Sequence, residues 1–232
     1  MNSILMICPT RNRPDRCSAM WASFTINKRE NTVLMLYIAD DDPQIEEYKK
    51  FFTGKCAIII GPRKEWAQLQ NELVAVHPGF DFYGHTADDY IYRTEGWDSK
   101  LIETIKLRGK GWGCACGLDL IHDNWYVTEH PGAAIVSANV INALGYYYYN
   151  EFWFMGIDEW QRDFFKELNA LFLDYRVIIE HVSPVCGKAE KDEPHAHIYE
   201  DPAQEFISLN AKFEWKLIAD EEIAKVRKAR GY

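Results

Sequence analysis

Four short apolar segments alternate with helix-like segments over the first ninety residues, and this alternation constrains the fold more than any other feature of the chain. The apolar segments, which indicate buried strands, cover residues 3–8, 32–39, 56–60 and 80–85. The segments between them have the apolar spacing of helices, over residues 16–24, 44–52 and 65–76. Because continuous apolar strands that alternate with helices form a parallel sheet covered on both faces, the sequence predicts an α/β domain.

Three of these predicted strands are followed by very polar stretches. Residues 9–13 read Pro-Thr-Arg-Asn-Arg, residues 40–42 are three aspartates, and residues 86–89 read Thr-Ala-Asp-Asp. Ligands of parallel sheets bind outside the carboxyl ends of the strands. We therefore expect the three stretches to meet at one edge of the sheet and to form a binding site.

The second half of the chain has a less regular pattern. We expect helices over residues 97–107, 138–144, 158–171 and 212–230, strands over residues 118–122, 133–137 and 175–180, and a polar loop over residues 187–202. The sequence shows no internal repeat and no low-complexity linker, so we expect a single domain.

Composition narrows the class of protein. Hydrophobic residues make up 47% of the 232 residues, which is enough for a sizeable core. The formal net charge of -9 argues against a broad basic face for nucleic acid, although the cluster Arg11, Arg13 and Arg16 could form a local basic groove. The six cysteines form no CxxC pair, which argues against a zinc site and a disulfide framework. The uncharged first ten residues and the lack of a long apolar run lead us to expect a cytoplasmic chain without a membrane anchor.

The adjacent carboxylates of Asp88 and Asp89 point to a cation. Two neighbouring carboxylates repel each other unless a cation or a hydrogen-bond donor lies between them. Oxygen ligands favour Mg²⁺ or Mn²⁺, which would neutralise the diphosphate of a nucleotide-sugar. The alternative is a solvated turn, because aspartate is common after strands.

The other strand exits offer further contacts to a nucleotide. A carboxylate from residues 40–42 could accept hydrogen bonds from a base or a ribose. Arg11, Arg13, Arg63 and Lys64 follow the first and third strands, where their charges could face phosphates. Surface placement without a function is the alternative for each of them.

The segments CPTRNRPD, IADDDP, GPRKEWAQLQNE and TADDYIYRTEGWD, in this order, resemble the nucleotide-sugar-binding half of family-2-like GT-A glycosyltransferases. The resemblance implies a Rossmann-like GT-A fold with a central, mostly parallel sheet. It also implies that certain residues contact the donor: Pro9, Thr10, Arg11 and Arg13 beside the nucleotide, Asp40 or Asp41 on the base, Arg63 nearby, and Asp88 and Asp89 on Mn²⁺ or Mg²⁺. Thr86 stands where the family's DxD-type motif often has its first aspartate, so either Asp88 or Asp89 is the direct ligand.

The same resemblance extends into the second half, where ALGYYYYNEFWF and DEWQRDFF are similar to the acceptor half of small phage- or metagenome-type members. An inverting transfer needs a base for the acceptor hydroxyl. Asp158 is our candidate and Glu159 is the second choice, with helix capping as the alternative role. The resemblance further implies that His181 completes the metal shell and that Lys188 binds the diphosphate.

The resemblance covers about residues 3–200. It divides the single domain into a nucleotide-sugar-binding half (1–96), an acceptor half (97–200) and a C-terminal helical segment (201–232). We predict a metal-dependent, inverting glycosyltransferase that prefers a UDP-sugar and transfers the sugar to a hydroxyl group. One candidate acceptor is 5-hydroxymethylpyrimidine in phage-type DNA, and glycans, lipids and proteins are alternatives.

Two other classes of function compete with this prediction. A nucleotidyltransferase also gathers carboxylates and a metal at strand ends, but residues 9–15 contain no glycine for its phosphate loop. A non-catalytic sugar- or nucleotide-binding module would keep the aromatic residues without needing Asp158 beside the metal. The sequence leaves the oligomeric state open.

Overall fold

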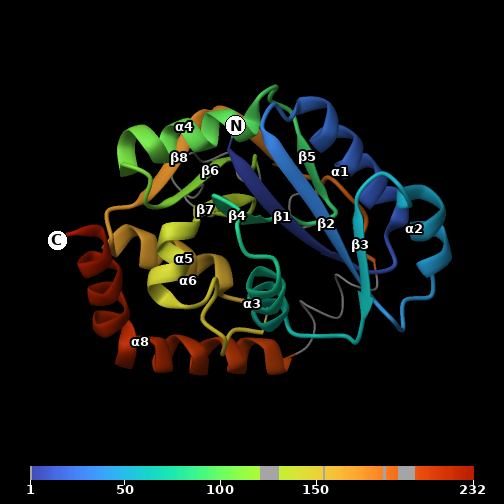
Figure 1. Ribbon diagram of the computed structural model, residues 1–232. Coiled ribbons are helices and arrows are strands. Elements are labelled where there is room, and N and C mark those ends of the chain that lie inside the picture. Colours follow the sequence, from blue (N-terminus) through green and yellow to red (C-terminus); the bar gives the residue numbers. More distant parts are fainter. Residues whose placement is uncertain (1, 121–130, 154, 185–186, 193–201) are drawn as a thin grey trace.

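One mixed sheet connects both halves of the chain in the computed structural model, which describes residues 2–120, 131–153, 155–184, 187–192 and 202–232. Within these residues the sheet has eight strands in the order β3-β2-β1-β4-β7-β6-β8-β5 (Figure 1). The strands are β1 (Ser3–Thr10), β2 (Asn31–Ala39), β3 (Ala57–Gly61), β4 (Phe82–His85), β5 (Tyr90–Tyr92), β6 (Cys114–Leu118), β7 (Ala134–Ser137) and β8 (Leu171–His181).

The first four strands of the sheet run parallel, as the alternating pattern predicts. β1 lies between β2 and β4, and β3 is paired to the other side of β2. The side chains of residues 4–8 in β1 are completely buried, because helices cover both faces of a parallel sheet. The carboxyl ends of these four parallel strands therefore lie at one edge of the sheet, where the loops after β1, β2 and β4 begin.

Helices cover both faces of this sheet. They are α1 (Pro14–Asn27), α2 (Ile45–Phe52), α3 (Trp66–Val76), α4 (Trp97–Gly109), α5 (Ala138–Leu144), α6 (Ile157–Glu167) and α8 (Pro202–Arg230). Figure 1 shows α1 and α4 on one side and α3, α5 and α6 on the other, with α8 outside α5 and α6. None of the helices in the described residues is both long and apolar enough to cross a lipid bilayer.

Aromatic side chains fasten α8 to the rest of the domain. Trp160 of α6 stacks on Phe164 with ring centroids 5.4 Å apart, and the edge of Trp215 from α8 meets Trp160 at 5.3 Å. Such pairs add to the burial of large apolar surfaces. This packing fixes α6, whose first turn carries Asp158 and Glu159.

The structure corrects several predicted element positions. The helix expected over residues 158–171 ends at Glu167, and the strand expected over residues 175–180 is β8 (Leu171–His181). The strand expected over residues 118–122 is β6 (Cys114–Leu118), and residues 121–122 lie outside the described residues. The last helix begins at Pro202 rather than at residue 212. The prediction did not include β5, a strand of three residues.

Asp98, the second residue of α4, ties this helix to the beginning of β2. Its side chain is completely buried and accepts hydrogen bonds from Arg29 N at 2.9 Å, Glu30 N at 2.9 Å and Thr32 Oγ1 at 2.7 Å. Ser99 N donates a further bond of 2.9 Å. The carboxylate therefore accepts hydrogen bonds from four donors and ties the start of α4 to the start of β2.

We expect Asp98→Asn to lower the free energy of unfolding by about 3 kcal/mol, because the amide nitrogen would face backbone N–H donors at a completely buried position. Urea unfolding followed by circular dichroism measures the change. Asp220→Asn on the exposed side of α8 is the matched control, and it should change stability by less than about 0.5 kcal/mol. Equal stabilities of the two variants would contradict this account of Asp98.

Candidate functional site

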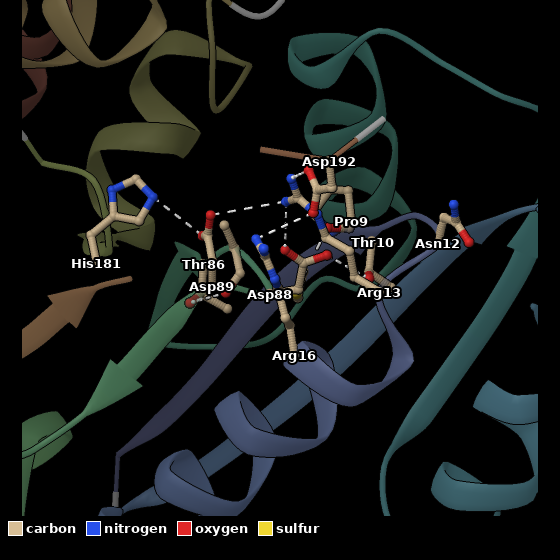
Figure 2. Close-up of polar contacts among 12 residues, drawn as sticks. Pro9, Thr10, Asn12, Arg13, Arg16, Thr86, Asp88, Asp89, His181 and Asp192 are labelled. Atoms are coloured by element: carbon tan, nitrogen blue, oxygen red, sulfur yellow. Dashed lines mark hydrogen bonds and ion pairs between the residues drawn. The ribbon is translucent and has the colours of Figure 1, made fainter. Parts of the chain in front are cut away.

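The loops after β1 and β4 meet at one edge of the sheet (Figure 2), and polar contacts bring the loop after β2 to the same edge, as the sequence predicts. Thr10 Oγ1 donates a hydrogen bond of 2.7 Å to Asp88. Arg11 Nη1 lies 2.6 Å from Asp41 Oδ1. These two contacts join the end of β1 to the residues that follow β4 and β2.

A tyrosine and an aspartate shape the loop after β1. Tyr48 of α2 is completely buried, and its hydroxyl accepts a bond of 2.8 Å from Arg13 N and lies 2.8 Å from Thr10 Oγ1. Asn12 has a positive φ of 53°, and its N–H donates to Asp42 at 2.8 Å. The local conformation therefore directs the side chain of Arg13 toward the residues after β4.

Arg13 is a fixed cation among three carboxylates. Its Nη1 lies 3.1 Å from Asp88 Oδ1 and 3.9 Å from Asp89 Oδ2. Its Nη2 and Nε donate to the two oxygens of Asp192 at 2.5 and 2.8 Å. Burial works to lower the pKa of Arg13, but the hydrogen bonds to Asp192 and the charge of Asp88 outweigh it and raise the pKa, so the guanidinium stays protonated.

The two adjacent aspartates have different surroundings. Asp88 is 4% exposed and is engaged by Thr10 and Arg13. Burial raises the pKa of Asp88 to about 6, the charge of Asp89 adds to the rise, and Arg13 opposes it. Asp89 instead faces His181, whose Nε2 lies 3.3 Å from Asp89 Oδ1.

Strand pairing brings His181 to Asp89. β5 follows directly after Asp89 and runs antiparallel to β8, with Tyr90 opposite His181. The two rings stack with centroids 4.5 Å apart, and Val182 N donates a bond of 2.8 Å to the carbonyl of Asp89. The imidazole is therefore held in place by both backbone and ring contacts.

Asp89 and His181 fit a divalent cation as a pair of ligands. Asp89 Oδ1 is buried and accepts no hydrogen bond from the described residues. Its 3.3 Å separation from His181 Nε2 is close to the ~3 Å between neighbouring ligands of an octahedral ion with bonds of about 2.1 Å. No three His, Cys, Asp or Glu side chains of the described residues form a complete metal cage. Mg²⁺ commonly takes only one or two carboxylates from the protein and completes its shell with phosphates and water.

The aspartates after β2 divide into exposed and buried residues. Asp41 is ion-paired with Arg11 and also lies 3.3 Å from Arg63 Nη2. Asp42 is buried and holds the backbone of Asn12 and Gln44. Asp40 is exposed and bonds through its N–H to the carbonyl of residue 61. The structure thus gathers Asp41 and Arg63 with the end of β1.

Asp158 and Glu159, in the first turn of α6, have different surroundings. Burial raises the pKa of Tyr90, and the charges of Asp158 and Asp89 raise that pKa further. The Asp158 charge also opposes the fall that burial causes in the pKa of His85, at the end of β4. Glu159 forms an ion pair with Lys212 of α8.

A left-handed glycine sets the start of α6. Gly156 has a φ of 81°, and a Cβ there would lie 2.4 Å from Ser208 Oγ of α8. Both the backbone conformation and the close approach of α8 favour glycine at this position. The turn therefore depends on Gly156 for presenting Asp158 from the first turn of α6.

Lys188 is not brought to the carboxylate pair. Its Nζ lies 2.8 Å from Glu180 Oε1 and donates to the carbonyl of Leu120 at 3.1 Å. Glu180 precedes His181 in β8, and successive side chains of a strand point to opposite faces. A role of Lys188 in binding a diphosphate stays a prediction. Pro9, the remaining predicted residue, lies within β1 opposite Tyr37.

The sequence did not reveal several residues of the site. Asp192 follows Arg13 by 179 positions, and no local pattern links the two. Tyr48 appeared only as a position of the helix expected over residues 44–52, and Tyr90 lay outside every expected strand. Spacing shows where a polar loop begins, but it does not show which distant side chain reaches it.

Comparison with known proteins shows which solved structures share this fold. No protein-family model and no curated protein matches the sequence. Among solved structures, the Pyrobaculum calidifontis mannosyltransferase PcManGT, in complex with GDP-Man and Mn²⁺, matches with a TM-score of 0.61 and 10% identity over 97% of this chain and 73% of the other. S. aureus TarS 1-349, in complex with UDP-GlcNAc, matches with a TM-score of 0.63 and 10% identity over 99% of this chain and 72% of the other.

A third structure supports the same placement. Glucosyl-3-phosphoglycerate synthase from Mycobacterium tuberculosis, in complex with Mg²⁺ and UDP, matches with a TM-score of 0.62 and 11% identity over 90% of this chain and 79% of the other. At such identities the likeness shows the fold alone. The chain is therefore a single α/β domain with a mixed, mostly parallel sheet that matches these GT-A-type structures, which confirms the predicted fold class.

Proposed function

We propose that this chain, with its GT-A fold, is a metal-dependent glycosyltransferase that moves a sugar from a nucleotide-sugar donor, preferably a UDP-sugar, to a hydroxyl acceptor. One observation carries the proposal: the loop after β4 presents Asp89 to His181 at 3.3 Å, at the sheet edge where β1 and β2 also end. The three structures compared above support it, because each is of a glycosyltransferase or a synthase in complex with a nucleotide or a nucleotide-sugar.

The nucleotide would lie over the ends of β1 and β2. Pro9, Thr10 and Arg11 would line it from one side. Asp41, between Arg11 and Arg63, is placed to accept hydrogen bonds from the base. Asp40 is exposed beyond this ion-pair group, so we favour Asp41 of the two.

Asp89 and His181 would hold Mn²⁺ or Mg²⁺, and Asp88 would act beside them. A bound cation neutralises the charge on the leaving diphosphate. Asp88 is engaged by Thr10 and Arg13, so it keeps the end of β1 against the loop after β4. In this proposal Asp89 is the direct metal ligand, and Asp88 positions Arg13.

Asp158 would accept the proton of the attacking hydroxyl in an inverting transfer. Its carboxylate stands at the start of α6, within electrostatic range of Tyr90, which stacks on His181. The base would thus lie beside the metal ligands. Glu159 is held by Lys212 and is the weaker candidate.

For the acceptor, we propose a hydroxyl group and include 5-hydroxymethylpyrimidine in DNA among those to be tested. The run of residues 143–165, which resembles phage-type enzymes, supports this choice. Incubation with a UDP-sugar and DNA that contains the modified base, followed by mass spectrometry of the nucleosides, identifies the product. A panel of glycan, lipid and protein acceptors tests the alternatives in the same way.

We expect a UDP-sugar with Mn²⁺ to raise the midpoint of thermal unfolding by about 5–10 °C at a ligand concentration 100-fold above Kd. A ligand that binds only the folded state stabilises it, so UDP-, GDP- and dTDP-sugars are screened with Mn²⁺ or with a chelator. The shift should depend on the metal and should disappear in Asp89→Asn. The absence of a shift with every donor and metal would contradict the proposed function.

A further inference from the structure

Two arginines converge on one carboxylate beside the proposed metal ligands. Arg13 binds both oxygens of Asp192, at 2.5 and 2.8 Å. Arg16, in the first turn of α1, lies with Nη1 3.3 Å from Asp192 Oδ2. Figure 2 shows the Arg13 and Arg16 side chains approaching Asp192 from the loop after β1 and from α1.

Both arginines are partly shielded from water and contact the same carboxylate. The side chain of Arg13 is 12% exposed and that of Arg16 is 28% exposed, so Arg13 is largely removed from water and Arg16 keeps partial access to solvent. The Glu190 carbonyl accepts a bond of 3.1 Å from Arg16 Nη2, which fixes that guanidinium. Two converging guanidinium forks match the oxygens of a carboxylate and equally those of a phosphoryl group.

Asp192 belongs to a segment that lies far along the chain from both arginines. Residues 187–192 follow β8 by several positions, whereas Arg13 and Arg16 belong to the first loop and helix of the chain. The Asp192 side chain is 28% exposed, so solvent reaches this carboxylate. Arg13 simultaneously contacts Asp88, so an anion in this place would lie next to the Asp88–Asp89 pair.

We propose that Arg13 and Arg16 form a subsite for phosphoryl oxygens, which the Asp192 carboxylate occupies as an internal anion when no ligand is bound. The ligand displaces Asp192 and takes over its contacts with both arginines. The site accepts either the diphosphate of the donor or a phosphate group on the acceptor. The proposed glycosyl transfer supplies these two candidate sources, whereas the anion site itself rests only on the contacts described above.

The proposal makes Asp192 a competitor of the ligand. Its negative charge repels an incoming phosphoryl group and occupies the same donors. Removing the charge of Asp192 should therefore tighten anion binding. Loss of a surface ion pair usually changes the stability of the fold little, so the variant should stay folded. Removing Arg16 should weaken binding without touching the carboxylates of Asp88 and Asp89.

The test is isothermal titration of the folded chain with inorganic pyrophosphate in the presence of a chelator. Asp192→Asn should bind pyrophosphate roughly tenfold more tightly than the natural chain. Glu190→Gln is the matched control, because it removes a charge from the same segment while the contact of Glu190 with Arg16 is through its backbone carbonyl. It should change the affinity by less than about twofold.

A double variant, Asp192→Asn with Arg16→Gln, should lose the increase in pyrophosphate affinity that Asp192→Asn alone produces. The proposal is overturned if Asp192→Asn binds pyrophosphate no more tightly than Glu190→Gln, or if the double variant binds as tightly as Asp192→Asn. Asp192→Ser provides the same comparison should the asparagine variant be unstable.

Two further titrations identify the source of the phosphoryl group. If it is the donor diphosphate, Asp192→Asn gains affinity for UDP but not for uridine, and pyrophosphate competes with UDP. If it is an acceptor phosphate, the gain is seen for a phosphate monoester in the presence of saturating UDP. If the chain transfers no sugar, the proposed function fails but the pyrophosphate result still tests the anion site. If the chain is active and Asp192→Asn binds pyrophosphate no more tightly than the natural chain, only the anion site is overturned.

Discussion

Replacing Asp89 with asparagine should lower the kcat of sugar transfer roughly a thousandfold while the chain stays folded. Asparagine keeps the size of the side chain but removes the charge that faces His181 Nε2. A neutral amide is a poor ligand for a hard divalent cation, so the leaving diphosphate would lose its neutralising partner. Steady-state kinetics with Mn²⁺ and the preferred donor measure the effect, and circular dichroism verifies the fold.

Asp41→Asn is the matched control for Asp89→Asn. Both residues are aspartates that follow strands at the same edge, but Asp41 contacts Arg11 and Arg63 rather than His181. We expect Asp41→Asn to raise the KM for the donor and to change kcat by less than about tenfold. The account fails if Asp89→Asn keeps a kcat within tenfold of the natural chain, or if the two variants cannot be told apart.

Replacing Asp158 with asparagine should lower kcat by about 10²–10⁴-fold and leave the Kd of the donor nearly unchanged. The asparagine cannot accept a proton, but it fills the same space in the first turn of α6. In the proposed site the donor would be held at the ends of β1, β2 and β4, whereas Asp158 belongs to α6. Single-turnover kinetics and calorimetric titration with the unreactive donor product UDP separate the two effects.

Glu159→Gln is the control for Asp158→Asn, because it changes the next carboxylate of the same turn. Glu159 pairs with Lys212 of α8, so its loss should change kcat by no more than about threefold and reduce stability only slightly. A loss of kcat in Glu159→Gln equal to that in Asp158→Asn would contradict the assignment of the base. A rise in the donor Kd of Asp158→Asn at constant kcat would contradict it as well.

Local patterns were sufficient for the parallel half of the sheet. β1, β2 and β4 are short apolar runs followed by polar residues, so their order and their common edge follow from the sequence. Their bounds follow less closely, because β1 continues through Pro9 to the buried Thr10 and β4 begins only at Phe82. The contacts of Thr10 with Asp88 and of Arg11 with Asp41 realise this expectation. Here the side-chain pattern and the topology of the sheet agree.

Long-range pairing accounts for what the sequence did not reveal. β5 has three residues, too few for a periodic pattern, and its position is decided by pairing with β8. That pairing places the Tyr90 ring on His181. β6 was expected too late in the chain, because the apolar residues near its end do not show which of them enter the ladder. Such choices depend on tertiary packing more than on propensity.

The most direct test of the central claim is pulsed electron paramagnetic resonance of Mn²⁺ bound to the chain with UDP. Our account predicts that the Mn²⁺ signal shows nitrogen coupling from one imidazole together with phosphorus coupling from the nucleotide. The nitrogen coupling should vanish in His181→Ala. Phosphorus coupling that comes with no imidazole nitrogen, or a nitrogen signal that persists in His181→Ala, would contradict a metal-bound diphosphate held at this edge of the sheet.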